Sequence, residues 1–519
     1  MYFTQPLHRN LQCAPERLMT IYGDRSRTLQ QFVERVARLA GALRELGVQS
    51  GDCVAMLGLN SDRYLEYCFA VPWADAVLNL CNTRWSAEEN AYALTDSQTS
   101  VLLVDETFKD IGLRLSRQVP SLRHVIYVGD GTTPDGMLDY ETLIARASPM
   151  EDARRGGDSL LGVFYTGGTT GFPKGVMISH TAFWSSQIAL DVEGLVPPDS
   201  VMLRAAPMFH LADMSTGYVG VLEGATHVIL PAFQPIEAMA AIQRHGIQVA
   251  MLVPTMIQLL INHPEVGNYD LSSLQHLVYG ASPIQEQTLW SLQAMLPQLQ
   301  LFQAYGQTEM SPIVSLLGPA QHTAAAAAAG MLRSCGRATR AVEVKIVDDD
   351  GREVPRGSIG EIVVRGPNAM SGYLNKPEQT LAALPGDGWL RTGDGARMDE
   401  NGYIFIVDRL KDMIVTGGEN VFSAEVENAL CSHPDIAMCA VIGIPSEQWG
   451  EAVHAVVVLK PGTEPNGEEL IAHCKRQIAG YKAPKSVEFR AALPLSGAGK
   501  VLKSELREPF WQGSSRRVG

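Results

Sequence analysis

Apolar side chains recur at helical spacing near the start of the chain. The pattern predicts an amphipathic helix over residues 28–46, followed by a buried strand at 53–57. The apolar positions that define this helix are Phe32, Val36, Leu39, Leu43 and Leu46.

Short apolar runs then alternate with helical patterns. Helices are predicted at 235–245 and 284–296. Strands are predicted at 101–105, 160–165, 227–230, 248–253, 274–280 and 299–305. This alternation is typical of α/β layers with substantial parallel sheet.

The pattern changes after about residue 340, where more exposed β structure with turns is predicted. A domain boundary is expected at 408–412, because a further small unit follows this charged segment. That unit is predicted to contain helices near 423–432 and 467–479, and strands near 437–443 and 453–459. The alanine run at 324–329 predicts a short helical turn or a mobile surface segment.

Composition narrows the class of protein. The net charge of -14 over 519 residues argues against an electrostatic nucleic-acid footprint. None of the eight cysteines lies in a CxxC pair, so a clustered zinc site is not expected. The cysteines are instead expected to be buried thiols of a protein in a reducing compartment. With no apolar signal core and no run of about 18 apolar residues, a cytoplasmic location without a transmembrane segment is expected. Peripheral membrane contact and a homodimer stay open.

The stretch "YTGGTTGFPKG" at 165–175 carries the first chemical signal. Glycines let backbone N–H groups point at an anion, threonines add hydroxyl donors, and Lys174 adds a compact positive charge. The loop follows a predicted strand and precedes "VMISHTAFW", which is expected to begin a helix. It is not a P-loop, since Pro173 precedes the lysine and Gly175 follows it. On composition alone, polyphosphate binding and a surface loop without a ligand both stay open.

With its neighbours, this loop resembles the phosphate loop of the adenylate-forming superfamily, which includes acyl-CoA synthetases, aryl-CoA ligases, luciferases and peptide-synthetase adenylation domains. Further motifs follow in the expected order, and the resemblance runs from about Thr28 to Glu508. They are "YGASP" at 279–283, "QAYGQTE" at 303–309, "GYLNKPEQT" at 372–380, "WLRTGD" at 389–394, "VDRLKDMIVTGGENVFSAEVE" at 407–427 and "GAGKVLKSELRE" at 497–508.

The resemblance implies an α/β fold with two parts. The larger is an N-terminal domain over 1–408, of mixed α/β layers with a β-barrel-like part. A hinge at 409–411 joins it to a small, mobile α+β lid at 412–519, with Lys411 at the hinge position. The implied substrates are a carboxylic acid, ATP and coenzyme A, with Mg²⁺ as cofactor. The acid attacks the α-phosphate and expels pyrophosphate, and a thiol then displaces AMP.

Three residues are implied in catalysis: Lys500, Thr166 and Glu309. Lys500 is expected to reach from the lid to the substrate carboxylate and the α-phosphate, and Glu309 is the expected Mg²⁺ ligand. Lys503 is expected to be an exposed lysine at the start of the following helix. The implied nucleotide site comprises Thr166, Gly167, Gly168, Thr169, Thr170, Gly171, Lys174, Gly280, Ala281, Ser282, Gln303, Ala304, Tyr305, Gly306, Gln307, Thr308, Asp394, Arg409 and Lys500.

The lid is also expected to form part of the coenzyme A site, through Gly417, Gly418 and Glu419. The acid is expected to contact His210, Ala212, Asp213, Thr216, Tyr279, Gly280, Gly306, Met310 and Ser311, with Tyr218 and Pro312 nearby. A largely apolar lining with small residues suits an alkyl or aryl acid. A medium- or long-chain fatty acid is favoured, with a cinnamate- or benzoate-type acid as the alternative.

Other readings stay open at this stage. The enzyme could load a carrier-protein thiol or stop at the acyl-adenylate. A light-emitting oxygenase on the same scaffold and a catalytically inactive binding protein are the remaining alternatives. Acid-dependent pyrophosphate release separates the last of these from a ligase.

Overall fold

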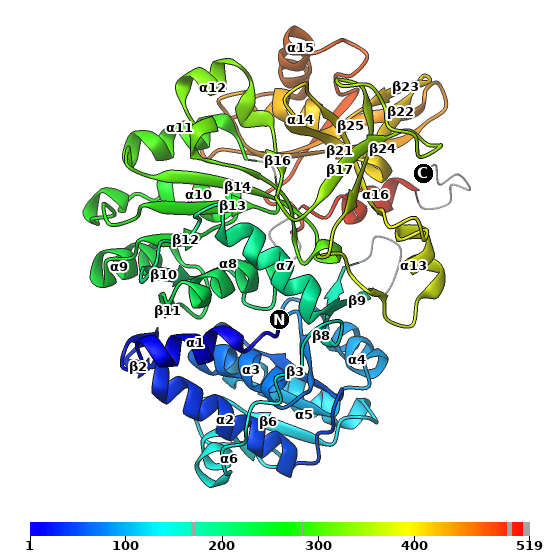
Figure 1. Cartoon of the computed structure of the whole chain (residues 1–519). Helices are drawn as coiled ribbons and strands as arrows, with labels where there is room; N and C mark the ends of the chain where they lie inside the picture. The colour runs from blue at the N-terminus through cyan, green and yellow to red at the C-terminus, as the bar shows by residue number, and fades with distance from the viewer. Residues whose placement is uncertain (168–172, 283, 496–500, 512–519) are drawn as a thin grey trace.

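The computed structural model describes residues 1–167, 173–282, 284–495 and 501–511. Figure 1 shows the N-terminal elements at one end of the molecule, the C-terminal elements at the other, and α7 to α11 between them. In the described residues, no helix is long and apolar enough to cross a bilayer.

One sheet of eight strands forms the N-terminal layer. Its strands run parallel from β7 to β8, whereas β9 and β19 are antiparallel additions at one edge. In spatial order they are β19 (Gly372–Tyr373), β9 (Lys174–Ser179), β8 (Leu160–Thr166), β4 (Val77–Leu80), β3 (Cys53–Leu57), β5 (Val101–Val104), β6 (His124–Tyr127) and β7 (Leu138–Asp139).

A second sheet of nine strands carries the middle of the chain. Its strands are parallel from β14 to β1, and antiparallel strands complete both edges. In spatial order they are β16 (Arg337–Ala338), β15 (Ile313–Leu317), β14 (Gln300–Gly306), β13 (His276–Gly280), β12 (Val249–Met251), β10 (Val201–Arg204), β11 (Thr226–Ile229), β1 (Leu18–Tyr22) and β2 (Arg25–Thr28).

Helices cover these two sheets, and their ends follow local sequence rules. Thr28 and Gln31 form a capping box at the start of α2, and Pro235 occupies the first turn of α9. The helices are α1 (Gln5–Cys13), α2 (Leu29–Glu45), α3 (Asp62–Trp73), α4 (Ala87–Asp96), α5 (Lys109–Gln118), α6 (Tyr140–Arg146), α7 (His180–Asp191), α8 (Leu211–Leu222), α9 (Pro235–His245), α10 (Pro254–Ile261), α11 (Glu286–Met295), α12 (Ala324–Ala328) and α13 (Pro377–Ala383).

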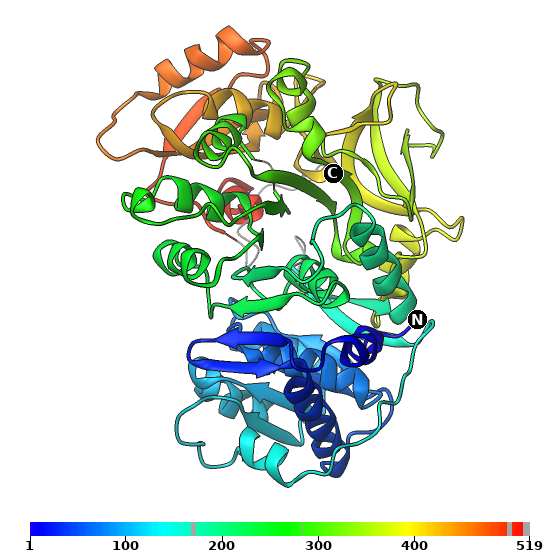
Figure 2. The same cartoon turned by 60° about the vertical axis from the view of Figure 1, so that its left-hand side comes forward.

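A third, antiparallel sheet of four strands lies in the region where a β-barrel-like part was expected, but it is an open sheet, because its edge strands β17 and β21 do not pair with each other. It lies beside the C-terminal elements in the second view (Figure 2). Its strands are β17 (Glu343–Val347), β18 (Ile359–Arg365), β20 (Leu390–Met398) and β21 (Ile404–Arg409).

The C-terminal part has hydrophobic clusters of its own, whose buried members all lie between Ile414 and Leu506. Its fourth sheet has the order β23–β22–β25–β24, with β26 paired to β25. The elements are β22 (Ile414–Thr416), β23 (Glu419–Val421), α14 (Ser423–Cys431), β24 (Ile436–Ser446), β25 (Gly450–Leu459), α15 (Gly467–Gln477), β26 (Ser486–Phe489) and α16 (Lys503–Trp511). The mixed α/β class and this small α+β unit are as expected from the sequence.

Candidate active site

The candidate site lies where three strands from two sheets end. Thr166 is the last residue of β8, Gly280 ends β13, and Gly306 ends β14. Ligands of open α/β sheets bind at the carboxyl ends of strands, because loops from different strands meet there. The fold therefore brings together motifs that are up to 140 residues apart in the chain (306 − 166 = 140).

Close main-chain contacts explain why two of these strands end in glycine. A Cβ atom at Gly280 would lie 2.1 Å from the carbonyl oxygen of Ala304, and one at Gly306 would lie 1.8 Å from that of Pro312. Either side chain would force neighbouring backbone apart. The next residue after β13, Ala281, has a φ of 66°.

Asp394, Tyr305 and Arg409 form a polar group beside these strand ends, in which Asp394 is buried and the Arg409 side chain is 42% exposed. The Tyr305 hydroxyl donates to Asp394 Oδ2 at 2.7 Å, and Arg409 Nε lies 2.9 Å from Oδ1. Asp394 and Arg409 are paired across β20 and β21. Burial and the nearby carboxylate raise the pKa of Tyr305, so the phenol stays protonated and donates. Burial disfavours the charge on Arg409, but Asp394 and its neighbours raise the pKa of the guanidinium.

A second group joins Lys174, Tyr373 and Glu309. The Tyr373 hydroxyl donates to Glu309 Oε1 at 2.8 Å, and Lys174 Nζ lies 4.4 Å from the centre of the Tyr373 ring. Lys174 begins β9, Tyr373 belongs to β19, and Glu309 lies in the short 3-10 turn Thr308–Met310. The structure thus places the predicted phosphate-binding lysine over the ring, and the predicted Mg²⁺ ligand at the hydroxyl, of one aromatic side chain.

The chain after the glycine loop corrects one prediction. Residues 174–179 form strand β9, antiparallel to β8, and α7 begins only at His180. The loop therefore joins two strands of a hairpin, not a strand to a helix. Gly175, Val176, Ile178 and Ser179 are buried while Lys174 and Met177 are partly exposed, so side chains on both faces of this strand are covered.

Several predicted loop residues lie outside the described part of the chain. Thr166 and Gly167 are described, and Thr166 pairs with Lys174 across the hairpin. Tyr165 donates from its hydroxyl to Asp96 Oδ2 at 2.8 Å, which ties the end of β8 to α4. The loop residues outside the described part are Gly168, Thr169, Thr170 and Gly171.

Buried amides hold the segment after β14, a feature that the sequence analysis missed. Asn368 Nδ2 donates to the carbonyl oxygens of Met310 and Ile313 at 2.9 and 2.8 Å. Gln187 Nε2 donates to the carbonyl of Ser311 at 3.1 Å. Ser311 is buried with a φ of 60°, a conformation that these contacts stabilise. Gln307 and Thr308, predicted for the nucleotide, lie at the start of this segment.

Small residues from three parts of the chain border one hydrophobic cluster, and one of them, Ala212, belongs to α8. Ala212, Ala281 and Ala304 all pack against the same hydrophobic cluster, whose members include Val253 and Phe302. These three positions were predicted independently for the acid and the nucleotide. Thr216 lies one turn after Ala212 and donates from its hydroxyl to the Ala212 carbonyl at 3.1 Å. His210 occupies the N-cap position of the same helix.

The negative charge of Asp213 is balanced by a buried cation of the protein. Its carboxylate forms a buried ion pair with Arg204, whose Nε lies 3.0 Å from Oδ2. Both side chains are only 3% exposed. Because a fully buried carboxylate needs such a partner, the pair accounts for an acidic residue in an otherwise apolar helix. The sequence analysis identified no cation for it.

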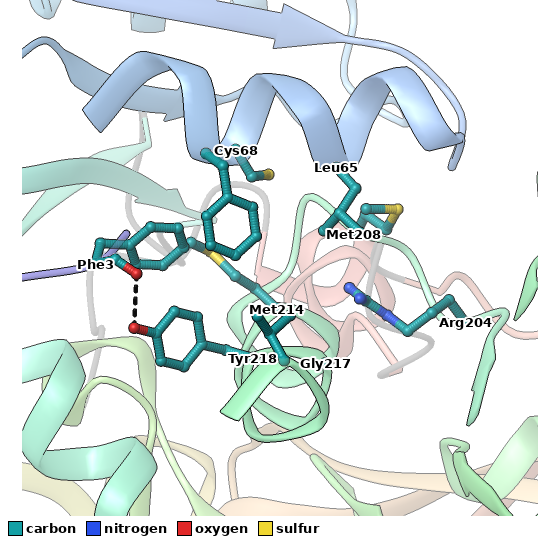
Figure 3. A pocket seen from close by; sticks show the side chains of 10 residues that line it. Phe3, Leu65, Cys68, Arg204, Met208, Met214, Gly217 and Tyr218 are labelled. Atoms are coloured by element: carbon teal, nitrogen blue, oxygen red, sulfur yellow. Dashed lines mark hydrogen bonds between the residues drawn. The ribbon is translucent and has the colours of Figure 1, made fainter. Parts of the chain in front are cut away.

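A small cavity lies on this other side of α8. Figure 3 shows Arg204, Met214 and Tyr218 around it, with Phe3 and Cys68 opposite. The Tyr218 hydroxyl donates to the Phe3 carbonyl at 2.7 Å, so Tyr218 faces the core and not the face that carries Ala212. The cavity volume is about 10 Å³, close to the minimum for one water molecule.

Tyr279 also points into the protein. Its hydroxyl lies 2.8 Å from His322 Nε2, and His322 Nδ1 lies 2.8 Å from the Gly318 carbonyl. Burial lowers the pKa of His322 to about 4, so the ring is neutral and accepts from Tyr279. Gln303 lies 3.4 Å from the same hydroxyl. The Tyr279 side chain is therefore bonded within the protein. A contact between Tyr279 and the acid stays a prediction, and it would involve the main chain of this residue.

The C-terminal part contributes three observations. Gly417 and Gly418, with φ of 61° and 84°, form the two-residue turn between β22 and β23, and Thr416 pairs with Glu419 across it. Lys503 begins α16 but is not exposed, because it pairs with Glu427 at 2.8 Å. The catalytic lysine that was predicted, Lys500, lies outside the described residues, as does the side chain of Lys411.

Comparison with known proteins agrees with this site. The AMP-binding enzyme family matches residues 7–374, and its C-terminal domain family matches residues 425–500. The chain is 38% identical over 503 residues to a feruloyl-CoA synthase from Amycolatopsis sp, which covers 97% of this chain and 98% of that protein. It is 36% identical over 513 residues to a medium/long-chain-fatty-acid–CoA ligase of Mycobacterium tuberculosis, and this match covers 96% of this chain and 88% of that protein.

A solved structure gives the same result at the level of the fold. The amide bond synthetase McbA from Marinactinospora thermotolerans is 31% identical, with a TM-score of 0.88, and the match covers 98% of this chain and 99% of that one. The chain therefore belongs to the AMP-binding enzymes of the adenylate-forming superfamily, and it is an ATP-dependent acid–CoA ligase of that superfamily.

Proposed function

We propose that the acid activated by this enzyme is a medium- or long-chain fatty acid. The observation that carries this proposal is the uncharged face of α8 that carries Ala212 and Thr216. Ala281 and Ala304 pack against the same hydrophobic cluster as Ala212. The one acidic residue of this helix is neutralised by Arg204. An apolar tail without a second charged group suits such a lining.

ATP fits the residues beside the strand ends. Asp394 is the acceptor proposed for the ribose hydroxyls, and Arg409 is the cation beside it. Gly280 and Gly306 let the main chain pack closely at these strand ends. Tyr305, which lies in β14, is the proposed stacking partner of the base. Lys174 at the end of the glycine loop would hold phosphate oxygens, and Thr166 would donate to them.

Mg²⁺ fits Glu309. The described residues contain no group of three or more metal-ligating side chains. This agrees with the way Mg²⁺ binds in nucleotide sites, through one or two carboxylates and the substrate phosphates. When bound, the ion supplies positive charge that offsets the phosphate anions.

The lid roles follow the resemblance. We place the N-terminal domain at 1–408, the hinge at Lys411 within 409–411, and the lid at 412–519. Lys500 would meet the substrate carboxylate and the α-phosphate in the first half-reaction. The turn at Gly417, Gly418 and Glu419 would line the path of coenzyme A in the second.

An aryl acid is the second candidate. The feruloyl-CoA synthase is named for an aryl acid, and its identity to this chain extends over nearly the full length of both proteins. A flat ring would occupy the same uncharged face of α8. This candidate differs from the first in the size of the acid, not in the chemistry of its activation.

A panel of acids tests the proposal. Pyrophosphate release is measured with ATP, Mg²⁺ and saturated acids from two to eighteen carbons, together with cinnamates and benzoates, with and without coenzyme A. Highest kcat/KM for a medium or long chain, with the matching acyl-CoA seen by mass spectrometry, supports the fatty-acid proposal. Highest kcat/KM for an aryl acid replaces it with the second candidate.

A further inference from the structure

The proposed reaction assigns no role to Tyr373. Its side chain is only 7% exposed and lies between two oppositely charged groups, Lys174 and Glu309. The motif "GYLNKPEQT" carried the family resemblance, but no role was predicted for its tyrosine.

The main chain around Tyr373 is fixed on both sides. The Leu374 N–H donates to the Gly175 carbonyl at 2.8 Å, beside Lys174 on β9. The Met370 N–H donates to the carbonyl of Glu309 itself, also at 2.8 Å. One short segment, 370–374, therefore joins the strand that carries the lysine to the turn that carries the glutamate.

The side chain separates the two charges. Lys174 Nζ lies 4.4 Å from the ring centre, where a cation is attracted by the π face. The hydroxyl at the far end donates to Glu309 Oε1, which leaves Oε2 for another partner. In the described part of the chain, no carboxylate forms an ion pair with Lys174. Without Tyr373, a lysine and a glutamate that both contact this one side chain could approach each other and neutralise their charges.

We propose that Tyr373 is a positioning residue that keeps Lys174 and Glu309 apart, so that the lysine stays available for phosphate and the glutamate for Mg²⁺. The hydroxyl orients the carboxylate, and the ring holds the ammonium group. This inference rests on the nucleotide and metal roles proposed above. It predicts that the hydroxyl and the ring have separable effects.

The test uses equilibrium binding, with no acid present. Mn²⁺ binding to the enzyme with α,β-methylene-ATP is measured by electron paramagnetic resonance, and binding of the same nucleotide in EDTA is measured by calorimetry. Tyr373→Phe keeps the ring and loses the donor. We expect its Kd for Mn²⁺ to rise about fivefold to tenfold, the scale of one ordinary hydrogen bond, because the lost bond orients the metal ligand and does not itself contact the ion. Metal-free nucleotide binding should change less than about twofold.

Removal of the ring should have a different result. In Tyr373→Leu, Lys174 and Glu309 are free to pair, so metal-free nucleotide binding should also weaken, by about fivefold or more. Adding Glu309→Gln to this variant removes the competing charge and should restore metal-free binding to within about twofold of the wild type. A purely structural role for Tyr373 would not produce this recovery.

Tyr403→Phe is the matched control, because Arg337 lies 4.2 Å above the Tyr403 ring outside the site. It should bind metal and nucleotide like the wild type. Wild-type Mn²⁺ affinity in Tyr373→Phe, or no recovery in the double variant, overturns the proposal. If Tyr373→Leu does not fold, the Mn²⁺ affinity of Tyr373→Phe alone decides whether the proposal stands. Absence of metal–nucleotide binding by the wild type would overturn the proposed site as well, whereas the choice of acid does not affect this assay.

Discussion

Among single residues, Asp394 is the one on which the proposed nucleotide site depends most directly. Its buried carboxylate accepts from Tyr305 and pairs with Arg409. Asp394→Asn removes the negative charge and one acceptor. We expect the Kd for ATP, measured by calorimetry, to rise about 10- to 100-fold, the scale of charge-assisted hydrogen bonds.

A nearby aspartate provides the control for this substitution. Asp399 follows β20 and accepts from the N–H groups of Asn401 and Tyr403, where it closes a turn. Asp399→Asn should leave ATP affinity within about twofold of the wild type. Equal ATP affinity in the Asp394 and Asp399 variants would remove Asp394 from the site.

At the scale of elements, the end of β14 has no room for a side chain. Gly306→Ala would place a Cβ atom 1.8 Å from the Pro312 carbonyl and force β14 away from β15. We expect the variant to unfold at a lower temperature and to bind ATP more weakly. Gly267→Ala is the control, since a Cβ there meets no atom within 4 Å. Thermal midpoints that fall equally in both variants would contradict this account.

The contact between β13 and the turn that holds His322 should make stability depend on pH. The pKa of His322 is lowered from 6.5 to about 4, so between these values the unfolded chain binds a proton that the native protein does not. Stability is therefore full above about pH 6.5 and falls as the pH is lowered toward 4. From about pH 7 to about pH 5 the loss is about 2 kcal/mol.

His322→Gln tests this dependence, because glutamine can still accept from Tyr279 but does not titrate. Thermal midpoints are measured across the same pH range for both proteins. The wild type should lose more stability on acidification than the variant. Parallel curves would show that His322 does not contribute in this way.

Element boundaries were predictable where local signals are strong. Helix α9 has the predicted bounds, with Pro235 in its first turn and Gly246 in the left-handed conformation after its end. The predicted helix start at "VMISHTAFW" was wrong over its first part. Those residues form β9, because they pair with β8 and because Val176 and Ile178 are β-branched residues that favour a buried strand.

At the scale of the whole molecule, the motifs predicted which residues meet but not what supports them. Arg204, Asn368 and Gln187 were missed because each acts through contacts that sequence spacing does not show. Tyr373 lay within a quoted motif, and only the structure shows the two charges on either side of it. Three-dimensional proximity between distant segments is the information that one sequence lacks.

The proposed lid should present different residues in the two half-reactions. Lys500→Ala is expected to reduce acyl-adenylate formation by roughly 10²- to 10³-fold, the scale for removing one preorganised charge donor. Thioester formation from preformed acyl-adenylate should be nearly unchanged, because the lid presents a different surface for that step. Single-turnover assays of each step measure both. An equal fall in the two rates would contradict the assigned role.

The central claim is that a set of cations and donors lets an acid anion attack a nucleotide anion. The most direct test is exchange of labelled pyrophosphate into ATP, measured without coenzyme A. We predict exchange that requires both an apolar acid and Mg²⁺. Exchange that proceeds without any acid, or none with any acid of the panel, would contradict this account.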